Sequence, residues 1–231
     1  MSMTQSIVVT GAAGGIGRYL RKVLPGVYPR LRWSDRVRPA DLAPGDDFVA
    51  ADLGDLAAVE RLLDGAQAVV HLGGVSGEAP WEAIRHANID GCYNLFEAAR
   101  RCTVERVVFA SSNHAVGFYP RRRRIGVDVP VRPDSRYGVS KAFGEALAAL
   151  YAYKHGLRVT CLRIGNFGER PIDRRRLSIW VAPDDLLQLI RIGLEHPDIH
   201  HEIFYAVSDN AQGWWDNEAA FRHGYRPTGR G

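Results

Sequence analysis

The chain has 231 residues, a length that suits one α/β domain. Its hydrophobic fraction of 46% is ordinary for a soluble protein with a core, and no apolar run approaches the ~18 residues that a membrane span needs. The sequence begins almost directly with a strand and a glycine turn rather than a secretory signal, and its three cysteines lack CxxC spacing. We therefore expect a cytoplasmic protein with reduced thiols and no metal site.

The positive charge is concentrated in two arginine runs, at residues 121–124 and 174–176, within a net charge of +4. Such runs can mark a nucleic-acid-binding patch, but these contain no interleaved aromatic residues and fall in expected loops. We expect neither nucleic acid nor a membrane as a partner. A small anionic substrate would explain part of the excess charge, and a solvated loop is the simpler interpretation of residues 121–124.

Short apolar runs alternate with helical patterns along the first 165 residues. In chain order we expect a strand at 6–10, a helix at 15–24, strands at 31–33 and 48–50, a helix at 55–64, a strand at 68–72, a helix at 81–101, a strand at 106–110, a helix at 135–155 and a strand at 158–164. Strands that helices cover on both faces consist of continuous apolar runs. The alternation therefore predicts a doubly wound parallel α/β sheet of the Rossmann type.

The pattern loosens after residue 165. There we expect a helix at 184–195, a strand at 202–207 and a short helix at 216–223. Because no linker is visible, residues 1–231 are predicted to form a single domain. Residues 1–165 would be the dinucleotide-binding core, and residues 166–231 a small substrate cap that does not fold independently. Such a cap would cover the carboxyl ends of the strands, where ligands bind in open α/β sheets.

A glycine-rich turn follows the first expected strand and opens the first expected helix. Gly11, Gly14 and Gly17 have the spacing GxxGxxG, a variant of the dinucleotide-binding fingerprint. Gly11 permits the tight turn, Gly14 lets the backbone approach a pyrophosphate, and Gly17 lets the helix pack closely on the sheet. The phosphates would bind the free N–H groups at the helix N-terminus. The turn predicts a dinucleotide cofactor.

The choice between NAD and NADP depends on the residue that ends the second strand. Asp35 stands there, and an acidic residue at this place binds the adenosine ribose hydroxyls and repels a 2′-phosphate. It therefore favours NAD. Arg36 and Arg38 in the same loop could instead accept such a phosphate, and an ordinary turn aspartate is the alternative interpretation of Asp35.

Tyr137 and Lys141 form a YxxxK pair on the helix expected after the fifth strand. Positions i and i+4 share one helix face, so the phenol and the ammonium are neighbours. The ammonium favours the phenolate, which can act as a general base. Ser111 and Ser112 end the fifth strand, and either could supply a hydroxyl to the substrate, although such a pair also occurs as a plain turn cap.

These motifs together resemble the extended short-chain dehydrogenases, the NAD-dependent epimerase/dehydratase family. Within that family the chain looks like the uronate dehydrogenases, over residues 6–226. The motifs that carry the likeness are HLGGVS (71–76), SSNHAVGFYP (111–120), YGVSK (137–141), RRLSIW (175–180) and GWWDN (213–217). Those enzymes oxidise C1 of a cyclic hexuronic acid, galacturonate or glucuronate, to an aldarolactone with NAD. The resemblance therefore implies an NAD-dependent oxidoreductase of carbohydrate metabolism with a small sugar acid as its partner.

The resemblance also implies a role for individual residues. The catalytic residues would be Tyr137, Lys141 and Ser112, the serine being chosen over Ser111 by its spacing to Gly117. The cofactor contacts would be Gly11, Gly14, Gly15, Ile16, Gly17, Asp35, Asp52, Leu53, Leu72, Gly73, Gly74, Tyr137, Lys141 and Ile164. The substrate contacts would be Ser76, Ser112, Asn113, His114, Asn166 and Arg175.

Several of these assignments have a second interpretation. Asp52, expected at the adenine amino group, could also cap the helix at 55–64. His114 could be an ordinary loop histidine. A guanidinium suits a substrate carboxylate, but Arg175 is distinguished from Arg174 and Arg176 only by the RRLSIW motif. In addition, Asn166 stands where the family has a small hydroxyl residue, and the sequence ends short of the family's usual C-terminal helical tail.

Two other functions share parts of the pattern. A sugar-nucleotide epimerase or dehydratase would use the same turn and the same Tyr–Lys pair, but would need a larger C-terminal domain. A non-catalytic NAD-binding regulator would keep the glycine turn without a reason to keep Ser112, Tyr137 and Lys141 together. Association into a homo-oligomer is compatible with the sequence.

Overall fold

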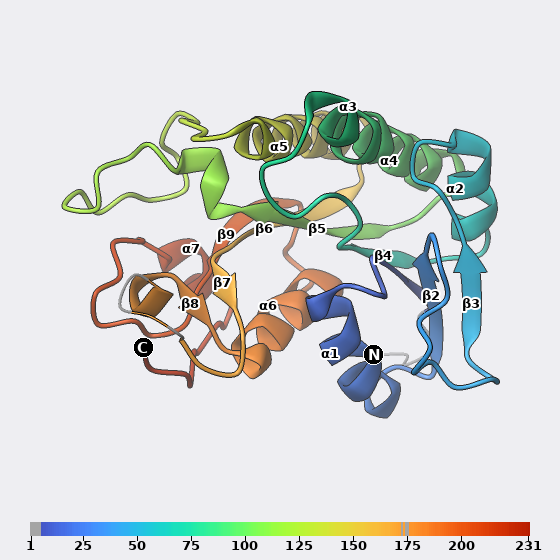
Figure 1. Cartoon of the computed structure of the whole chain (residues 1–231), viewed down its shortest axis with the longest axis horizontal. Coiled ribbons are helices and arrows are strands. Elements are labelled where there is room, and N and C mark those ends of the chain that lie inside the picture. Colours follow the sequence, from blue (N-terminus) through green and yellow to red (C-terminus); the bar gives the residue numbers. More distant parts are fainter. Residues whose placement is uncertain (1–5, 172, 174–175) are drawn as a thin grey trace.

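The computed structural model describes residues 6–171, 173 and 176–231. Within these residues, seven parallel strands form one twisted sheet with helices on both faces (Figure 1). In spatial order the strands are β3 (Asp47–Ala50), β2 (Arg30–Asp35), β1 (Ser6–Thr10), β4 (Ala68–His71), β5 (Arg106–Ser112), β6 (Arg158–Ile164) and β9 (His201–Ala206). The order reverses between β1 and β4, so the predicted doubly wound α/β fold is confirmed.

The helices divide into two layers, one on each face of the sheet (Figure 1). One layer contains α2 (Leu56–Leu63), α3 (Trp81–Ile84), the π-helical turn η2 (Arg85–Asp90), α4 (Gly91–Arg101) and α5 (Arg136–His155). The other contains α1 (Gly15–Val23), α6 (Pro183–Glu195) and α7 (Glu218–Arg222). Short 3-10 turns lie at Leu24–Gly26, Asn113–Val116 (η3) and Arg176–Ser178.

The two faces of the sheet pack into separate hydrophobic cores, and β5 shows why. Val107 and Phe109 point into the core beneath α2, α4 and α5, while Val108 points into the core beneath α1 and α6. All seven residues of β5 are buried. A strand with apolar neighbours on both sides therefore needs a continuous apolar run, which is the pattern that predicted it.

The largest departures from the expected elements occur in two places. The expected helix at 81–101 is interrupted by η2, which carries the buried side chain of Asn88. The expected strand at 106–110 continues to Ser112, because Ser111 and Ser112 pair with Arg163 and Ile164 of β6. The second departure adds two polar residues to the carboxyl end of the strand.

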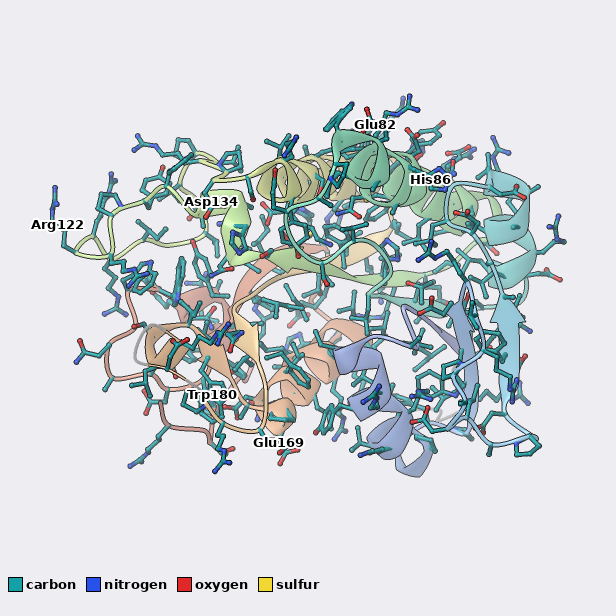
Figure 2. The ribbon with its side chains drawn as sticks, viewed as in Figure 1. Glu82, His86, Arg122, Asp134, Glu169 and Trp180 are labelled. Atoms are coloured by element: carbon teal, nitrogen blue, oxygen red, sulfur yellow. The ribbon has the colours of Figure 1, made fainter. Side chains whose placement is uncertain are left out.

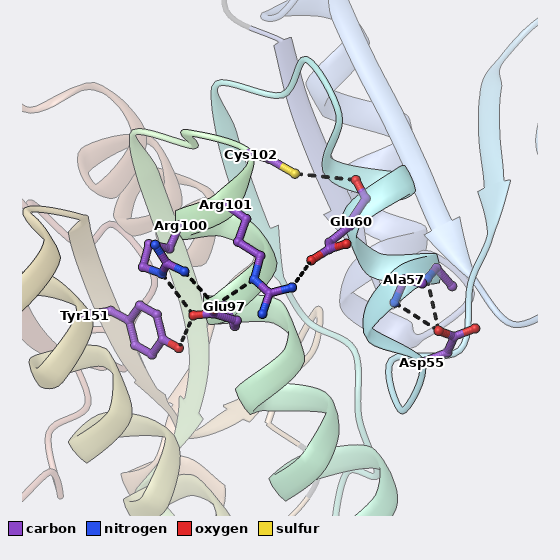
Figure 3. A network of polar contacts seen from close by, with 9 residues as sticks. Asp55, Ala57, Glu60, Glu97, Arg100, Arg101, Cys102 and Tyr151 are labelled. Atoms are coloured by element: carbon purple, nitrogen blue, oxygen red, sulfur yellow. Dashed lines mark hydrogen bonds and ion pairs between the residues drawn. The ribbon is translucent and has the colours of Figure 1, made fainter.

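A cluster around Glu97 ties α4 to α5 away from the ends of the strands (Figure 3). The Glu97 carboxylate accepts hydrogen bonds from Arg100, Arg101 and the Tyr151 hydroxyl, the last at 2.9 Å. Its pKa is held well below the ordinary value, chiefly by the Arg100 hydrogen bond and with further contributions from Arg101 and Tyr151. Arg101 also bonds to Glu60 of α2, so the cluster joins three helices.

The segment after residue 165, expected to form only a cap, also supplies a strand of the main sheet. Its strand β9 extends the main sheet beyond β6, so the sheet crosses the expected core–cap boundary. The strands β7 (Asn166–Phe167) and β8 (Trp180–Val181) form a separate two-stranded sheet. Whether residues 166–231 depend on the core for folding stays a prediction. Among the described residues, no helix combines the length and apolar character required to cross a membrane.

Candidate active site

The expected site residues gather at the carboxyl edge of the sheet. Ser112 and Ile164 are register partners at the ends of β5 and β6, and Ile164 pairs in turn with Ala206 of β9. Gly11 directly follows β1, and Gly73 lies two residues after β4. This edge is the place where open α/β sheets bind ligands.

The glycine turn leaves no space for additional side chains at two of its positions. Gly11 has a φ of +72°, and a Cβ on it would lie 2.8 Å from the Gly73 nitrogen. A Cβ on Gly17 would lie 2.3 Å from the Gly11 oxygen, whereas one on Gly15 would meet nothing within 4 Å. Gly14 caps α1 without a side chain, and the first turn of α1 carries no acidic residue. The turn therefore fits the pyrophosphate of a dinucleotide.

Asp35 is the last residue of β2 and lies against the same turn. Its Oδ2 accepts a hydrogen bond from the Ala13 N–H at 2.9 Å, and its Oδ1 accepts one from the Arg36 N–H at 2.8 Å. Arg38 points into its own loop, where Nη2 donates to the Ala43 oxygen at 2.6 Å and the guanidinium lies over the Phe48 ring. The carboxylate is thus the group from this loop that contacts the turn.

Asp52 and Leu53 follow β3 at the edge of the expected cofactor region. The exposed Asp52 carboxylate accepts from the Gly54 N–H and lies 3.0 Å from His86 Nε2, and both contacts lower its pKa. The cap of α2 is Asp55, which accepts from two backbone N–H groups of the first turn. The interpretation of Asp52 as that cap is therefore wrong, because the helix begins three residues later than such a cap would require.

The loop after β4 is held by buried polar contacts. The Thr10 hydroxyl accepts from the Gly73 N–H at 3.1 Å and shares a hydrogen bond with His71 Nδ1 at 2.8 Å. Burial lowers the pKa of His71 to about 3, so its ring is neutral at physiological pH. Leu72 is half-buried, and Gly74, at a φ of +134°, lies against Asn88. The loop expected to line the dinucleotide is therefore a fixed one.

Tyr137 and Lys141 lie next to each other in the first turns of α5. Lys141 is buried, and its Nζ donates to the Ala110 oxygen at 2.7 Å. The same Nζ is 5.5 Å from the centre of the Tyr137 ring. The half-buried Tyr137 ring also meets the His114 ring edge-on, with 5.7 Å between centroids. An ammonium thus lies beside the phenol, as the i, i+4 spacing predicts.

The two serines at the end of β5 have different surroundings. Ser111 donates to Glu145 Oε1 at 2.6 Å, within a buried ion pair in which Arg163 donates to both oxygens of Glu145. Ser112 Oγ instead accepts from the His114 N–H at 3.2 Å and donates to Asn113 Oδ1, another expected substrate contact, at 3.3 Å. Because the Ser111 hydroxyl is held by the buried Glu145 carboxylate, the geometry favours Ser112 as the hydroxyl for a substrate.

The remaining expected substrate contacts are less closely grouped. Asn113 and His114 lie in η3 directly after Ser112, while Ser76 is exposed in the loop between β4 and α3. Asn166 lies in β7 and is half-buried, with its N–H bonded to the Ile179 oxygen. Arg175 lies outside the described residues.

Sequence reasoning missed Asn88. Its Oδ1 accepts from the Val75 N–H at 2.8 Å, and its Nδ2 donates to the Val75 oxygen and to Ser140 Oγ, both at 3.0 Å. Ser140 Oγ donates in turn to the backbone carbonyl oxygen of Tyr137. Asn88 therefore ties the loop that carries Ser76 to the helix that carries Tyr137. The available signal was a polar residue four positions after Ile84 on the inward helix face.

The arginine run at 121–124 lies in an exposed loop, as the simpler interpretation expected, and it also contacts a segment distant in the sequence. The Arg121 guanidinium lies 5.5 Å from the Trp214 ring centre, and the Ile125 N–H donates to the Trp214 oxygen at 3.0 Å. Arg122 projects outward from the segment between η3 and α5, residues 117–135, which we call the arm (Figure 2). This aromatic partner lies outside the run, 93 residues further along the chain, so the sequence of the run does not reveal it.

Comparison with known proteins identifies the family. The model of the NAD dependent epimerase/dehydratase family matches residues 7–183. The chain belongs to this family. Uronate dehydrogenase from Pseudomonas putida is 45% identical over 222 residues, 96% of this chain and 83% of that protein. The expected family and its NAD cofactor are thereby confirmed.

Two solved structures of epimerase/dehydratase family members share the fold closely. Glucuronic acid dehydrogenase from Chromohalobacter salexigens has a TM-score of 0.95 at 42% identity, covering 98% of this chain and 85% of that one. A mutant of uronate dehydrogenase from Agrobacterium tumefaciens, complexed with NAD, has a TM-score of 0.95 at 41% identity. That match covers 98% of this chain and 86% of the mutant's chain.

Proposed function

We propose that this chain is an NAD-dependent dehydrogenase that oxidises C1 of a cyclic hexuronic acid, galacturonate or glucuronate, to the aldarolactone. The observation that carries this proposal is the 44–45% identity to uronate dehydrogenases, which extends over 96% of the chain. The adjacency of Tyr137 and Lys141 at the carboxyl edge of the sheet supports it with a catalytic base in the required place.

The cofactor would lie across the carboxyl edge of the sheet, and NAD supplies the hydride acceptor when it is bound. Gly11, Gly14 and Gly17 leave the N-terminus of α1 open for the pyrophosphate. Asp35 would bind the adenosine ribose and repel a 2′-phosphate, and Arg38 is engaged with the Ala43 oxygen. Asp52, Leu53, Gly15, Ile16, Leu72, Gly73, Gly74 and Ile164 would complete the cofactor contacts.

Tyr137 is the proposed proton acceptor. Oxidation of a hydroxyl releases a proton, and a phenolate within hydrogen-bonding reach of that hydroxyl can take it. The Lys141 ammonium lies beside the ring, with its Nζ 5.5 Å from the ring centre, and would assist the proton transfer. Ser112 Oγ would donate a hydrogen bond to the same substrate oxygen and so hold C1 in place.

The substrate would be held by side chains from several segments, namely Ser76, Asn113, His114, Asn166 and Arg175. We assign the carboxylate to Arg175, because a guanidinium offers two parallel donors to a carboxylate. The other residues offer hydrogen bonds suited to sugar hydroxyls. We also propose a cytoplasmic location, since all three cysteines are free thiols.

The proposed function is tested by measuring NADH formation with a panel of sugars at equal concentration. Galacturonate or glucuronate should give the highest kcat/KM, and nucleoside-diphosphate sugars should give no NADH. Conversion of a nucleoside-diphosphate sugar into a new product without net NADH, detected by product analysis, would favour the epimerase or dehydratase alternative, because such reactions return the hydride and regenerate NAD. NAD binding without turnover of any sugar would favour the non-catalytic regulator.

A further inference from the structure

His114 has one ring nitrogen engaged in a fixed contact. Its Nδ1 lies 2.8 Å from Asp134 Oδ1, and the same carboxylate oxygen accepts from Ser135 Oγ at 3.1 Å. Ser135 caps α5 by accepting from the Gly138 N–H at 3.0 Å. Asp134 therefore connects His114 to the start of the helix that carries Tyr137.

The backbone around this pair is packed too closely for either residue to shift freely. A Cβ on Gly117 would lie 2.1 Å from Asp134 Oδ2, and a Cβ on Gly138 would lie 2.4 Å from the His114 oxygen. The His114 oxygen also accepts from the Asp134 N–H at 3.3 Å. Both residues are therefore held by backbone contacts as well as by their side chains.

The pairing determines which hydrogen-bonding role His114 can offer to a ligand. An ionised carboxylate only accepts hydrogen bonds, so in the neutral ring the proton lies on Nδ1. Nε2 is then an acceptor, and it has no hydrogen-bond partner among the described residues. The side chain is 40% exposed and its ring lies against Tyr137, so it borders the place where the substrate would bind.

We propose that Asp134 is a positioning residue that holds His114 in the Nδ1–H form, so that Nε2 accepts a hydrogen bond from a substrate hydroxyl. A hydroxyl can donate to such a nitrogen, whereas a carboxylate cannot. His114 would thus select for a hydroxyl on the sugar ring and leave the carboxylate to another residue. The inference rests on the proposed function and names what one of its substrate contacts recognises.

The first test uses galacturonate and its 2-, 3- and 4-deoxy analogues. A site built to bond a hydroxyl rejects the analogue that lacks it, by roughly 10²-fold or more in kcat/KM. His114→Ala should lose this discrimination against one of the three analogues and keep it against the other two. If the variant still discriminates against all three, His114 does not bind a ring hydroxyl, and that part of the proposal is overturned.

The second test asks whether Asp134 acts through His114. Asp134→Ala should lower kcat/KM by roughly 10-fold or more in the wild-type background, and by less than about 2-fold in the His114→Ala background. NAD affinity should not change in either background. Equal losses in both backgrounds would show that Asp134 acts elsewhere. Ser135→Gly is the matched control, because it removes the other contact of Asp134 at little cost to the helix cap, and it should leave kcat/KM within about 3-fold of wild type.

A third measurement does not depend on turnover. Imidazole ¹⁵N NMR at a pH where the His114 ring is neutral should show this ring in the Nδ1–H form. The His114 signal is the one that is absent from the spectrum of His114→Ala. Asp134→Ala removes the acceptor of the Nδ1 proton, so the population should shift toward Nε2–H. An unchanged tautomer in Asp134→Ala would overturn the positioning role. The Nδ1–H form in a protein that oxidises no uronate would refute the proposed function and not the role of Asp134.

Discussion

The proposed cofactor side of the site is built largely from backbone, whereas the proposed substrate side is built from side chains on separate segments. On the cofactor side, a Cβ on Gly11 would meet main-chain atoms of the loop at Gly73, and a Cβ on Gly17 would meet main-chain atoms of the turn itself. On the substrate side, Ser76, His114 and Asn166 come from three different segments. The cofactor side therefore tolerates few substitutions, while single substitutions on the other side can retune the substrate.

The largest effect on the substrate side is expected at Arg175. If its guanidinium holds the uronate carboxylate, Arg175→Ala should cost about 2–5 kcal/mol in kcat/KM for the acid, because the carboxylate would lose its charged partner. Any activity on the matching neutral hexose should fall far less. Steady-state kinetics with both sugars measures the difference.

Two neighbouring arginines are the controls for that prediction. Arg176 already pairs with Asp173 at 3.1 Å, so Arg176→Ala should change kcat/KM little, and Arg174→Ala is expected to do the same. Equal losses for acid and neutral sugar in Arg175→Ala would indicate a folding role instead. Arg175 would then not be the residue that recognises the substrate carboxylate.

On the cofactor side, Gly17→Ala should destabilise the fold. Its Cβ would lie 2.3 Å from the Gly11 oxygen, and overpacking of this kind costs about 1–3 kcal/mol. Gly15→Ala is the matched control, since a Cβ there meets nothing within 4 Å and alanine suits a helix better than glycine. Urea unfolding of both variants should separate them. Equal stability would mean that the turn is more adaptable than its packing indicates.

A smaller effect is expected at Asp35. Asp35→Ala removes both the ribose acceptor and the charge that repels a 2′-phosphate, so the preference for NAD over NADP should narrow by roughly tenfold, about 1.4 kcal/mol. The hydrogen bond from the Ala13 N–H is lost as well, which should lower the melting temperature slightly. Kinetic constants with both cofactors decide the matter, and an unchanged preference would exclude Asp35 from cofactor selection.

The sequence predicted the buried strands and the glycine turn because local pattern determines them. Continuous apolar runs indicated the buried strands, and the glycine spacing indicated the turn that follows β1. The fifth strand was expected to span 106–110 with Ser111 and Ser112 at its end, and the pairing of these serines with Arg163 and Ile164 shows that both belong to the strand itself. Asp55 was passed over for Asp52 as the α2 cap, since two aspartates three residues apart look alike in sequence.

Contacts between distant segments could not be predicted from local pattern. The Arg121–Trp214 stacking joins residues far apart in the chain, and so does the bond between Asn88 and Ser140. The pairing of His114 with Asp134 requires the chain to return over the arm that separates them. For the substrate side, the family resemblance supplied residues that periodicity could not.

The central claim is that Tyr137 is the base in an NAD-dependent oxidation of uronates. The most direct test is the rate of NADH formation by Tyr137→Phe, with NAD and the preferred uronate at saturating concentration. Removing a general base costs about 10²–10⁴-fold, and NAD affinity should survive because the ring and Lys141 remain in place. A loss of this size with unchanged NAD binding is the predicted result. Turnover close to that of the wild type would contradict the account.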